Sequence, residues 1–367
     1  MIQKTKRGRG SLGKVRELME KLNITKPLLV TGNTLAPVFY EKALPEAECV
    51  RFSGYHPNPA WEDVAAAVAL YRENGCDGII SLGGGSAMDT AKAVKALLLA
   101  GGMEAVRRNQ LPEGKLPHIA VPGTAGTGAE ATPIAVVYEN NEKLSLDHTA
   151  LLPEGIILDG SLLDTLPLYH KKACAMDALC QGIESYWAVK ATAESRIHAE
   201  KAILGVLHNM DAYLAGEAAA ADAVLEAAYE SGCAIRISRT TAAHAMSYQI
   251  TKRLGYAHGY ACMLTLPHLW RHMGDTPVIR ELNVMMGSAD GSPLLQGLLA
   301  ALDMLPQEMP DDVTLDALAA SVNVERLGNH PECLTAQELR AIYVQAFTPI
   351  PEEEKVRLAT LWRDYAG

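Results

Sequence analysis

Three side chains in the second half of the chain, Asp177, His244 and His258, are of the types that bind a divalent metal. One carboxylate and two imidazoles suit zinc or iron and leave a coordination position open for a substrate oxygen. Asp177 lies in a helical run, and Gln181 one turn later points the same way, but its neutral amide is a poor ligand. A single histidine on an apolar helix is usually a core residue, so the predicted metal site depends on all three residues together.

The other histidines are interpreted as surface or structural residues. His268 and His272 lie one helical turn apart and form a weaker alternative, a second site. The remaining ones are His56, His118, His148, His170, His198, His208 and His330.

Two glycine-rich segments in the first half are typical of nucleotide-binding turns. In SLGGGSAMDTAK (81–92), the glycines let the backbone approach a pyrophosphate, and Ser86 begins a helix whose free N–H groups attract anions. The alternative is a purely structural turn, in which Asp89 is simply an acidic residue in the first turn of the helix, favoured there by the helix dipole. The second segment, VPGTAGTGAEAT (121–132), adds the hydroxyls of Thr124 and Thr127. Two such loops, each after an apolar strand, favour a nucleotide site at the carboxyl edge of a parallel sheet.

The elements that must position these residues fall into two parts. Residues 1–165 alternate apolar runs with helical runs, which predicts a parallel sheet covered by helices. Residues 166–367 are dominated by helical spacing, which predicts an all-helical domain. Expected strands are 26–32, 47–54, 77–85, 116–123 and 134–140, and expected helices are 61–75 and 86–102.

Composition excludes some classes of protein. The chain has 367 residues, too many for one ordinary core, and its net charge of −10 disfavours nucleic-acid binding. The seven scattered cysteines include no CxxC pair and are interpreted as reduced thiols. No signal sequence and no membrane-spanning apolar run is visible. We therefore expect a cytoplasmic protein without membrane association.

Together, GGGSAMDTAK, PGTAGTGAEAT, MDALCQGIESYW and the His244–His258 segment resemble the iron-containing, or group III, alcohol dehydrogenases. The resemblance covers nearly the whole chain in the family's order. It implies a dehydroquinate synthase-like fold, NAD(P)-dependent interconversion of an aldehyde and an alcohol, one divalent metal (iron or zinc) and a homo-oligomer. It assigns metal binding to Asp177, His244 and His258, with His244 and His258 at the catalytic centre. It assigns cofactor binding to Gly84, Gly85, Ser86, Asp89, Thr124, Thr127 and, as a weaker match, Lys143.

The chain departs from the family's pattern at three positions. Gln181 replaces a usual histidine ligand, which leaves three strong ligands or three plus an amide oxygen. Tyr248 replaces a second common histidine, and its phenol could bind substrate, relay a proton or only pack. Gly32 stands where NAD-preferring members often carry aspartate, which repels a 2′-phosphate, so we predict that NADPH is accepted alongside or in preference to NADH.

A narrower resemblance concerns the substrate. MDALCQGIESYW, RTTAAHAMSYQIT and NVERLGNHPECLT are similar to the subgroup called phosphonoacetaldehyde reductases, which implies a small anionic aldehyde reduced to 2-hydroxyethylphosphonate. A phosphonate requires cations. Four basic residues that flank the metal segment could supply them, with ordinary solvated helix charge as the alternative: Arg236, Arg239, Lys252 and Arg253.

Two rival functions use the same residues. A lyase of the dehydroquinate synthase type would use NAD transiently with zinc in a densely basic pocket, and this density is absent around the metal segment. A non-catalytic nucleotide-binding or oligomer-forming protein would bind cofactor without metal and without turnover, and the loss of a histidine at Gln181 is the reason to consider it.

Overall fold

The computed structural model describes residues 3–112, 116–140, 142–323 and 327–367. The chain divides into two compact units, Met1–Leu166 and Pro167–Gly367. Part of the segment NVERLGNHPECLT, residues 324–326, lies outside the described residues. Among the described helices, none combines the length and the apolar character needed to cross a membrane.

The first unit contains a six-stranded, fully parallel sheet in the order β1-β8-β5-β4-β2-β3. Its central strands are buried on both faces, as expected for a parallel sheet covered on both sides. The strands are β1 Lys4–Arg7, β2 Pro27–Thr31, β3 Val50–Phe52, β4 Gly78–Gly83, β5 His118–Pro122 and β8 Gly155–Leu158.

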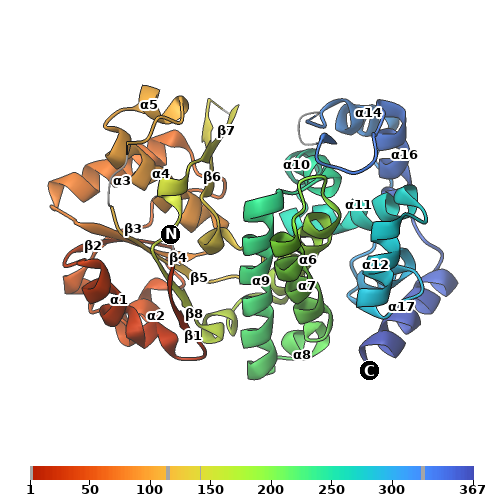
Figure 1. Cartoon of the computed structure of the whole chain (residues 1–367), viewed down its shortest axis with the longest axis horizontal. Helices are drawn as coiled ribbons and strands as arrows, with labels where there is room; N and C mark the ends of the chain where they lie inside the picture. Colours follow the sequence, from red (N-terminus) through yellow and green to blue (C-terminus); the bar gives the residue numbers. More distant parts are fainter. Residues whose placement is uncertain (1–2, 113–115, 141, 324–326) are drawn as a thin grey trace. The chain divides into compact units, whose positions relative to one another are not determined.

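Helices cover both faces of this sheet (Figure 1). Leu28 on β2 belongs to a core shared with α3 and α4, whereas the next residue, Leu29, belongs to a core shared with α1 and α2. This alternation follows from the two-residue period of a strand. The helices of this unit are α1 Val15–Leu22, α2 Ala36–Lys42, α3 Trp61–Glu73, α4 Gly85–Ala100 and α5 Met103–Arg107.

The strand expected at 134–140 is present, but its expected place in the parallel sheet is wrong. β6 (Ile134–Glu139) pairs in antiparallel register with β7 (Glu142–Asp147) and forms a separate two-stranded sheet. Only alternate residues of β6 are buried, which is the pattern of a hairpin with one face on the core. Two further strands of four residues each were not predicted: β1, whose sequence KTKR is mostly basic, and β8.

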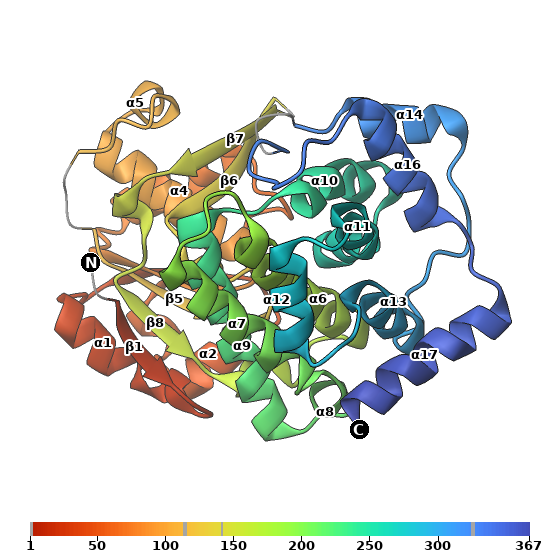
Figure 2. The same ribbon diagram turned by 45° about the vertical axis from the view of Figure 1, so that its right-hand side comes forward.

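The second unit is helical, so the predicted fold class of a parallel α/β part followed by a helical part is confirmed. Within it α11 contacts α6, α10, α13 and α16, and Figure 2 shows it among these helices. The helices are α6 Leu168–Trp187, α7 Ala193–Leu207, α8 Met210–Leu214, α9 Ala218–Ser238, α10 Ala242–Leu254, α11 His258–Met273, α12 Pro277–Met286, α13 Gly291–Ala301, α14 Asp312–Ala320, α16 Ala336–Phe347 and α17 Glu352–Ala366.

Candidate functional site

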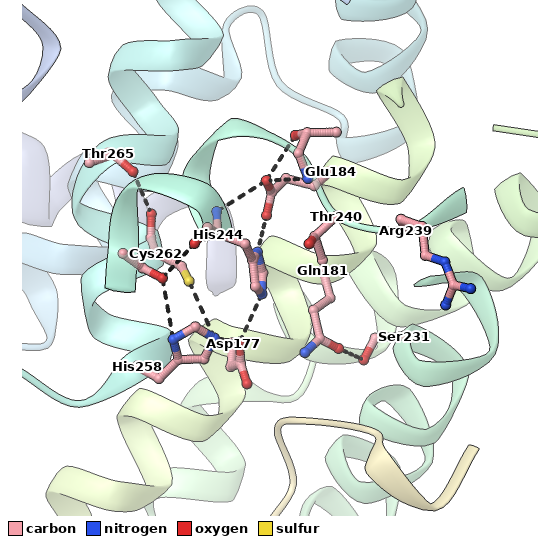
Figure 3. A network of polar contacts seen from close by, with 12 residues as sticks. Asp177, Gln181, Glu184, Ser231, Arg239, Thr240, His244, His258, Cys262 and Thr265 are labelled. Atoms are coloured by element: carbon pink, nitrogen blue, oxygen red, sulfur yellow. Dashed lines mark hydrogen bonds and ion pairs between the residues drawn. The ribbon is translucent and has the colours of Figure 1, made fainter. Parts of the chain in front are cut away.

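Three helices of the second unit bring Asp177, His244, His258 and Cys262 together (Figure 3). One ligand atom from each residue lies within 4.8 Å of those of the others. Asp177 Oδ1 is 3.3 Å from His244 Nε2 and 3.9 Å from His258 Nε2. Among the described residues, no other group of three or more histidine, cysteine or acidic side chains is gathered in this way. The structure thus places the three metal ligands predicted from the sequence side by side.

Two atoms of this cluster fit the needs of a cation. The side chains of Asp177 and His244 are only 4% and 5% exposed. Among the described residues, neither Asp177 Oδ1 nor His244 Nε2 has a hydrogen-bond partner of good geometry, although the two lie close together. Burying polar atoms without such partners is costly, and a metal ion coordinated by both would remove that cost. The donor set of carboxylate, imidazoles and sulfur suits zinc or iron(II).

The close approach of α11 to α6 depends on Gly259. α11 begins at His258, and a Cβ on the next residue would lie 2.1 Å from the carbonyl oxygen of Ala173 and 2.5 Å from Asp177 Cβ. Only glycine leaves room for the two helix backbones at this distance. Ahead of the helix, the Tyr169 hydroxyl accepts a hydrogen bond of 3.1 Å from the N–H of Ala257. The first turn of α11 is therefore held directly against Asp177.

A buried carboxylate behind the cluster orients His244. Glu184 is fully buried two turns after Asp177 on α6, and its Oε2 contacts His244 Nδ1. Its other oxygen accepts hydrogen bonds from the N–H (2.9 Å) and the hydroxyl (2.8 Å) of Thr241. A carboxylate opposite Nδ1 keeps a proton on that nitrogen, so Nε2 presents its lone pair to the cluster.

His258 is held in a similar way by a hydroxyl. Ser247 Oγ donates to the carbonyl oxygen of His244 at 2.9 Å and lies 3.3 Å from His258 Nδ1. Because the hydroxyl proton is already used, this oxygen can accept a proton from Nδ1, which leaves Nε2 of His258 for the cluster. The ring of Tyr248 stacks on that of His258 with centroids 5.9 Å apart. Both imidazoles thus offer the same nitrogen to the ligand group.

The charges of the cluster are strongly coupled. Burial raises the pKa of Asp177, but His244 and then His258 outweigh it, so that pKa lies below its ordinary value. Burial lowers the pKa of His244, yet Cys262 and Glu184 raise it well above the usual value. Burial raises the pKa of Cys262, and the two imidazoles lower it to below its ordinary value. Without a metal these shifts favour a second proton, on Nε2, and binding of a cation there would displace that proton and free the lone pair.

Gln181 does not offer its oxygen to the cluster. Its Oε1 accepts a 2.8 Å hydrogen bond from Ser231, and its amide lowers the pKa of Asp177 by hydrogen bonding. Figure 3 shows the amide nitrogen on the side that faces the cluster. Two members of the site, Cys262 and Glu184, were not among the residues predicted from the sequence. Both could have been found by helical spacing: Cys262 is one turn after His258, and Glu184 shares a face with Asp177.

The weaker alternative at His268 and His272 finds no third ligand in the described part of the chain. His268 is buried, and burial lowers its pKa to about 4. It therefore stays neutral inside the helical core.

In the first unit, the two glycine loops lie against each other at the carboxyl edge of the sheet. Gly123 N–H donates to the carbonyl oxygen of Gly83 at 2.8 Å. A Cβ on Gly84 would lie 3.3 Å from the Thr124 side chain, and one on Gly85 would lie 3.3 Å from that of Thr127. Gly83 itself has a φ of 152°, which disfavours other residues. The glycines and both threonines predicted to bind cofactor thus form one surface, next to the N-terminus of α4.

A buried lysine fixes the second loop relative to α4. Lys92 Nζ donates to the carbonyl oxygens of Ala129 (2.6 Å) and Ile134 (2.7 Å), and burial lowers its pKa to about 8. Asp89, one turn earlier, has its pKa raised to about 6 by burial, and Lys143 is close enough to lower that pKa. The structure therefore brings Asp89 and Lys143 to the same part of the unit, at the β6–β7 hairpin.

Gly32 lies at the same edge of the sheet, directly after β2. Thr31 is in register with Leu82 on β4, so Gly32 lies beside Gly83. A Cβ on Gly32 would make only an ordinary 3.5 Å contact with the Tyr55 hydroxyl. On the neighbouring strand β3, Arg51 binds the side chain of Asn33, the residue after Gly32. This edge of the sheet therefore carries an arginine on β3, and position 32 carries no acidic side chain.

Comparison with known proteins gives a consistent result. Residues 3–160 match a family model described as iron-containing alcohol dehydrogenase, and residues 172–344 match one for the C-terminal part of the Fe-containing alcohol dehydrogenase family. The chain is 33% identical over 315 residues to a phosphonoacetaldehyde reductase of Streptomyces viridochromogenes, covering 77% of this chain and 80% of that protein. It is 28% identical to a lactaldehyde reductase of Escherichia coli, covering 81% of each.

Solved structures share the fold. A sulfoacetaldehyde reductase from Bifidobacterium kashiwanohense, determined in complex with NAD+, superposes with a TM-score of 0.89 at 24% identity, covering 95% of this chain and 98% of that one. The likeness extends over both units of the chain.

The role of Glu184 is tested by Glu184→Gln. The amide would place an N–H donor opposite His244 Nδ1, which would shift the proton to Nε2 and remove the lone pair from the cluster. We expect zinc affinity, measured by competition with a chromogenic chelator, to fall by roughly 10- to 100-fold. The matched control is Glu230→Gln, which alters a Glu–His pair with His198 between α9 and α7, outside the cluster. Equal zinc affinity in both variants would contradict the assigned role.

Proposed function

The chain belongs to the iron-containing alcohol dehydrogenase family, and from this premise we propose that it is a metal-dependent, NAD(P)H-linked reductase of short aldehydes. The observation that carries the proposal is the buried group of Asp177, His244 and His258. A carboxylate and an imidazole nitrogen without good hydrogen-bond partners face one another there. The glycine loops of the first unit support nucleotide binding, since their backbone and the start of α4 suit a pyrophosphate.

In this proposal Asp177, His244 and His258 hold iron or zinc. The bound metal supplies a Lewis acid for the carbonyl oxygen, and reduced nicotinamide supplies the hydride. The chain's own contribution is orientation: Glu184 and Ser247 bind the Nδ1 atoms of the two histidines and direct both Nε2 atoms inward. Tyr248, stacked on His258, is a candidate to deliver a proton from its hydroxyl.

The function is tested by His258→Ala. Short aldehydes are assayed with NADPH and NADH after reconstitution with zinc or iron(II), and the metal content is measured in parallel. Because Lewis-acid stabilisation is worth several kcal/mol, we expect kcat to fall on the order of a thousandfold with loss of bound metal. His272→Ala, on the exposed end of the same helix, is the control. Full turnover and metal content in His258→Ala, or a wild type that binds cofactor without metal or turnover, would contradict the proposal.

For the cofactor we propose that NADPH is used, and preferred, because of the surroundings of Gly32. In sheets of this kind, an acidic residue at the end of the strand beside the glycine loop binds ribose hydroxyls, and an arginine nearby accommodates a 2′-phosphate. Here the strand end carries glycine, and Arg51 lies on the adjacent strand, bonded to Asn33. A 2′-phosphate would find a cation and no repelling carboxylate.

Gly32→Asp tests this preference. Its Cβ has room, so the unit should fold, but the new carboxylate would repel the 2′-phosphate. Like charges in contact cost several kcal/mol, so we expect kcat/KM for NADPH to fall at least tenfold while NADH is retained or improved. Gly32→Ser, which adds a side chain without charge, is the control. A wild type that strongly favours NADH, or a Gly32→Asp variant with unchanged preference, would contradict this cofactor assignment.

For the substrate we propose a short aldehyde with an anionic head group, of the phosphonoacetaldehyde type. The 33% identical relative bears that name. Of the four basic candidates, Lys252 and Arg253 are exposed at the end of α10, whereas Arg236 and Arg239 are half-buried at the end of α9. Figure 3 shows the guanidinium of Arg239 turned back towards the side of Gln181 and Ser231. Of the four, we therefore choose Arg239 as the cation that would bind the anionic head group.

Arg239→Gln tests the anionic head group. A hydrogen bond to a charged group contributes about 1.5–3 kcal/mol, so KM for phosphonoacetaldehyde should rise roughly 10- to 100-fold, while propionaldehyde is reduced as before. Arg253→Gln, on the exposed turn of α10, is the matched control. An equal effect on both aldehydes would contradict a role in reading the anion.

A further inference from the structure

The sulfur of Cys262 belongs to the same cluster as the carboxylate and the two imidazoles. It lies 3.9 Å from His258 Nε2 and within 4.8 Å of the ligand atoms of Asp177 and His244. Figure 3 shows it directed into the space that these residues surround. Four potential ligand atoms therefore share one small volume, three from nitrogen or oxygen and one from sulfur.

Helix geometry and helix packing explain why the sulfur of Cys262 lies beside His258 and Asp177. His258 and Cys262 are four residues apart on α11, so their side chains lie on one face of the helix. The packing of Gly259 against Asp177 then points that face at α6. Cys180 is also buried nearby, on α6 itself, but it is not part of the ligand group. Of these two buried cysteines, Cys262 is the one whose sulfur belongs to the ligand group.

The fourth position of the cluster is not supplied by Gln181. Its amide oxygen is bonded to Ser231, and its amide interacts with Asp177 as a hydrogen-bond donor. A centre held by Asp177, His244 and His258 alone would have three protein ligands, one of them a partly exposed imidazole. Cys262 is 0% exposed, so it is sheltered from substrates that a nucleophilic thiol would have to attack. A buried sulfur among ligand atoms is suited to binding a metal.

We propose that Cys262 is the fourth protein ligand of the metal centre, in place of the amide at position 181; this rests on the proposed metal-dependent function. On binding, the thiol releases its proton to solvent and the sulfur donates an electron pair to the metal, with no change of oxidation state. Two anionic and two neutral ligands then neutralise a divalent ion. Thiolate and imidazole donors favour zinc or iron(II) over magnesium, calcium or manganese.

The test is the absorption spectrum of the full chain loaded with cobalt(II), an ion whose bonds to thiolate give intense near-ultraviolet charge-transfer bands. We expect one cobalt per chain and such a band in the wild type and in Cys180→Ser. In Cys262→Ser the band should disappear. X-ray absorption of the zinc-loaded wild type provides a second readout that needs no variant. It should show one sulfur at about 2.3 Å, besides nitrogen and oxygen at about 2.0–2.2 Å.

The outcomes separate this proposal from the proposed function. Cobalt bound without a sulfur band, or zinc without a sulfur neighbour, would overturn the role of Cys262 and leave the Asp177, His244 and His258 centre intact. A band that persists in Cys262→Ser and is lost in Cys180→Ser would overturn it as well. A wild type that binds neither metal would overturn the metal-dependent function itself.

Discussion

The contact between the first turn of α11 and the middle of α6 is the constraint on which the rest of the site depends. Gly259 allows the two backbones to approach so closely that any Cβ would overlap Ala173 and Asp177. As a result His258, the first residue of α11, stands over the carboxylate of Asp177. A buried carboxylate and buried imidazoles at this distance are costly unless they share charge or a cation. The packing thus creates a buried group of charges that protons on the imidazoles or a bound cation can balance.

Residues around the cluster determine which atoms face it. Glu184 and Ser247 each contact the Nδ1 atom of one histidine, so both Nε2 atoms point inward. The same Glu184 accepts hydrogen bonds from Thr241 just before α10, which ties the helix that carries His244 to α6. Helix positions and histidine tautomers are therefore set by one buried network. Such outer partners typically change metal affinity by roughly 10- to 100-fold.

Sequence patterns predicted much of this molecule because its strongest patterns are local. Strands buried on both faces, such as β2 and β4, are continuous apolar runs, and glycine turns mark where they end. The β6–β7 hairpin was misplaced because a single apolar run does not say which strand it will pair with. β1 was not predicted because this strand at the edge of the sheet, with the sequence KTKR, lacks the apolar run that marks the buried strands.

The candidate site shows the same limit. Asp177, His244 and His258 could be selected from the sequence because their residue types suggest a metal. Cys262 was interpreted as an ordinary reduced thiol. Its spacing of one turn from His258 on α11 is the signal in the sequence, whereas its other two neighbours in the cluster come from α6 and α10. Tertiary packing, rather than spacing, decides that Gln181 turns its oxygen to Ser231 while a thiol faces the ligands.

The central claim is that one divalent ion is bound between α6, α10 and α11. It is tested most directly by anomalous diffraction at the zinc absorption edge from crystals of the zinc-loaded protein. We predict a single strong peak per chain at about 2.0–2.2 Å from an oxygen of Asp177 and from Nε2 of both His244 and His258. Fully loaded crystals with no peak at this position, or with the two imidazoles turned away from the carboxylate, would contradict the account.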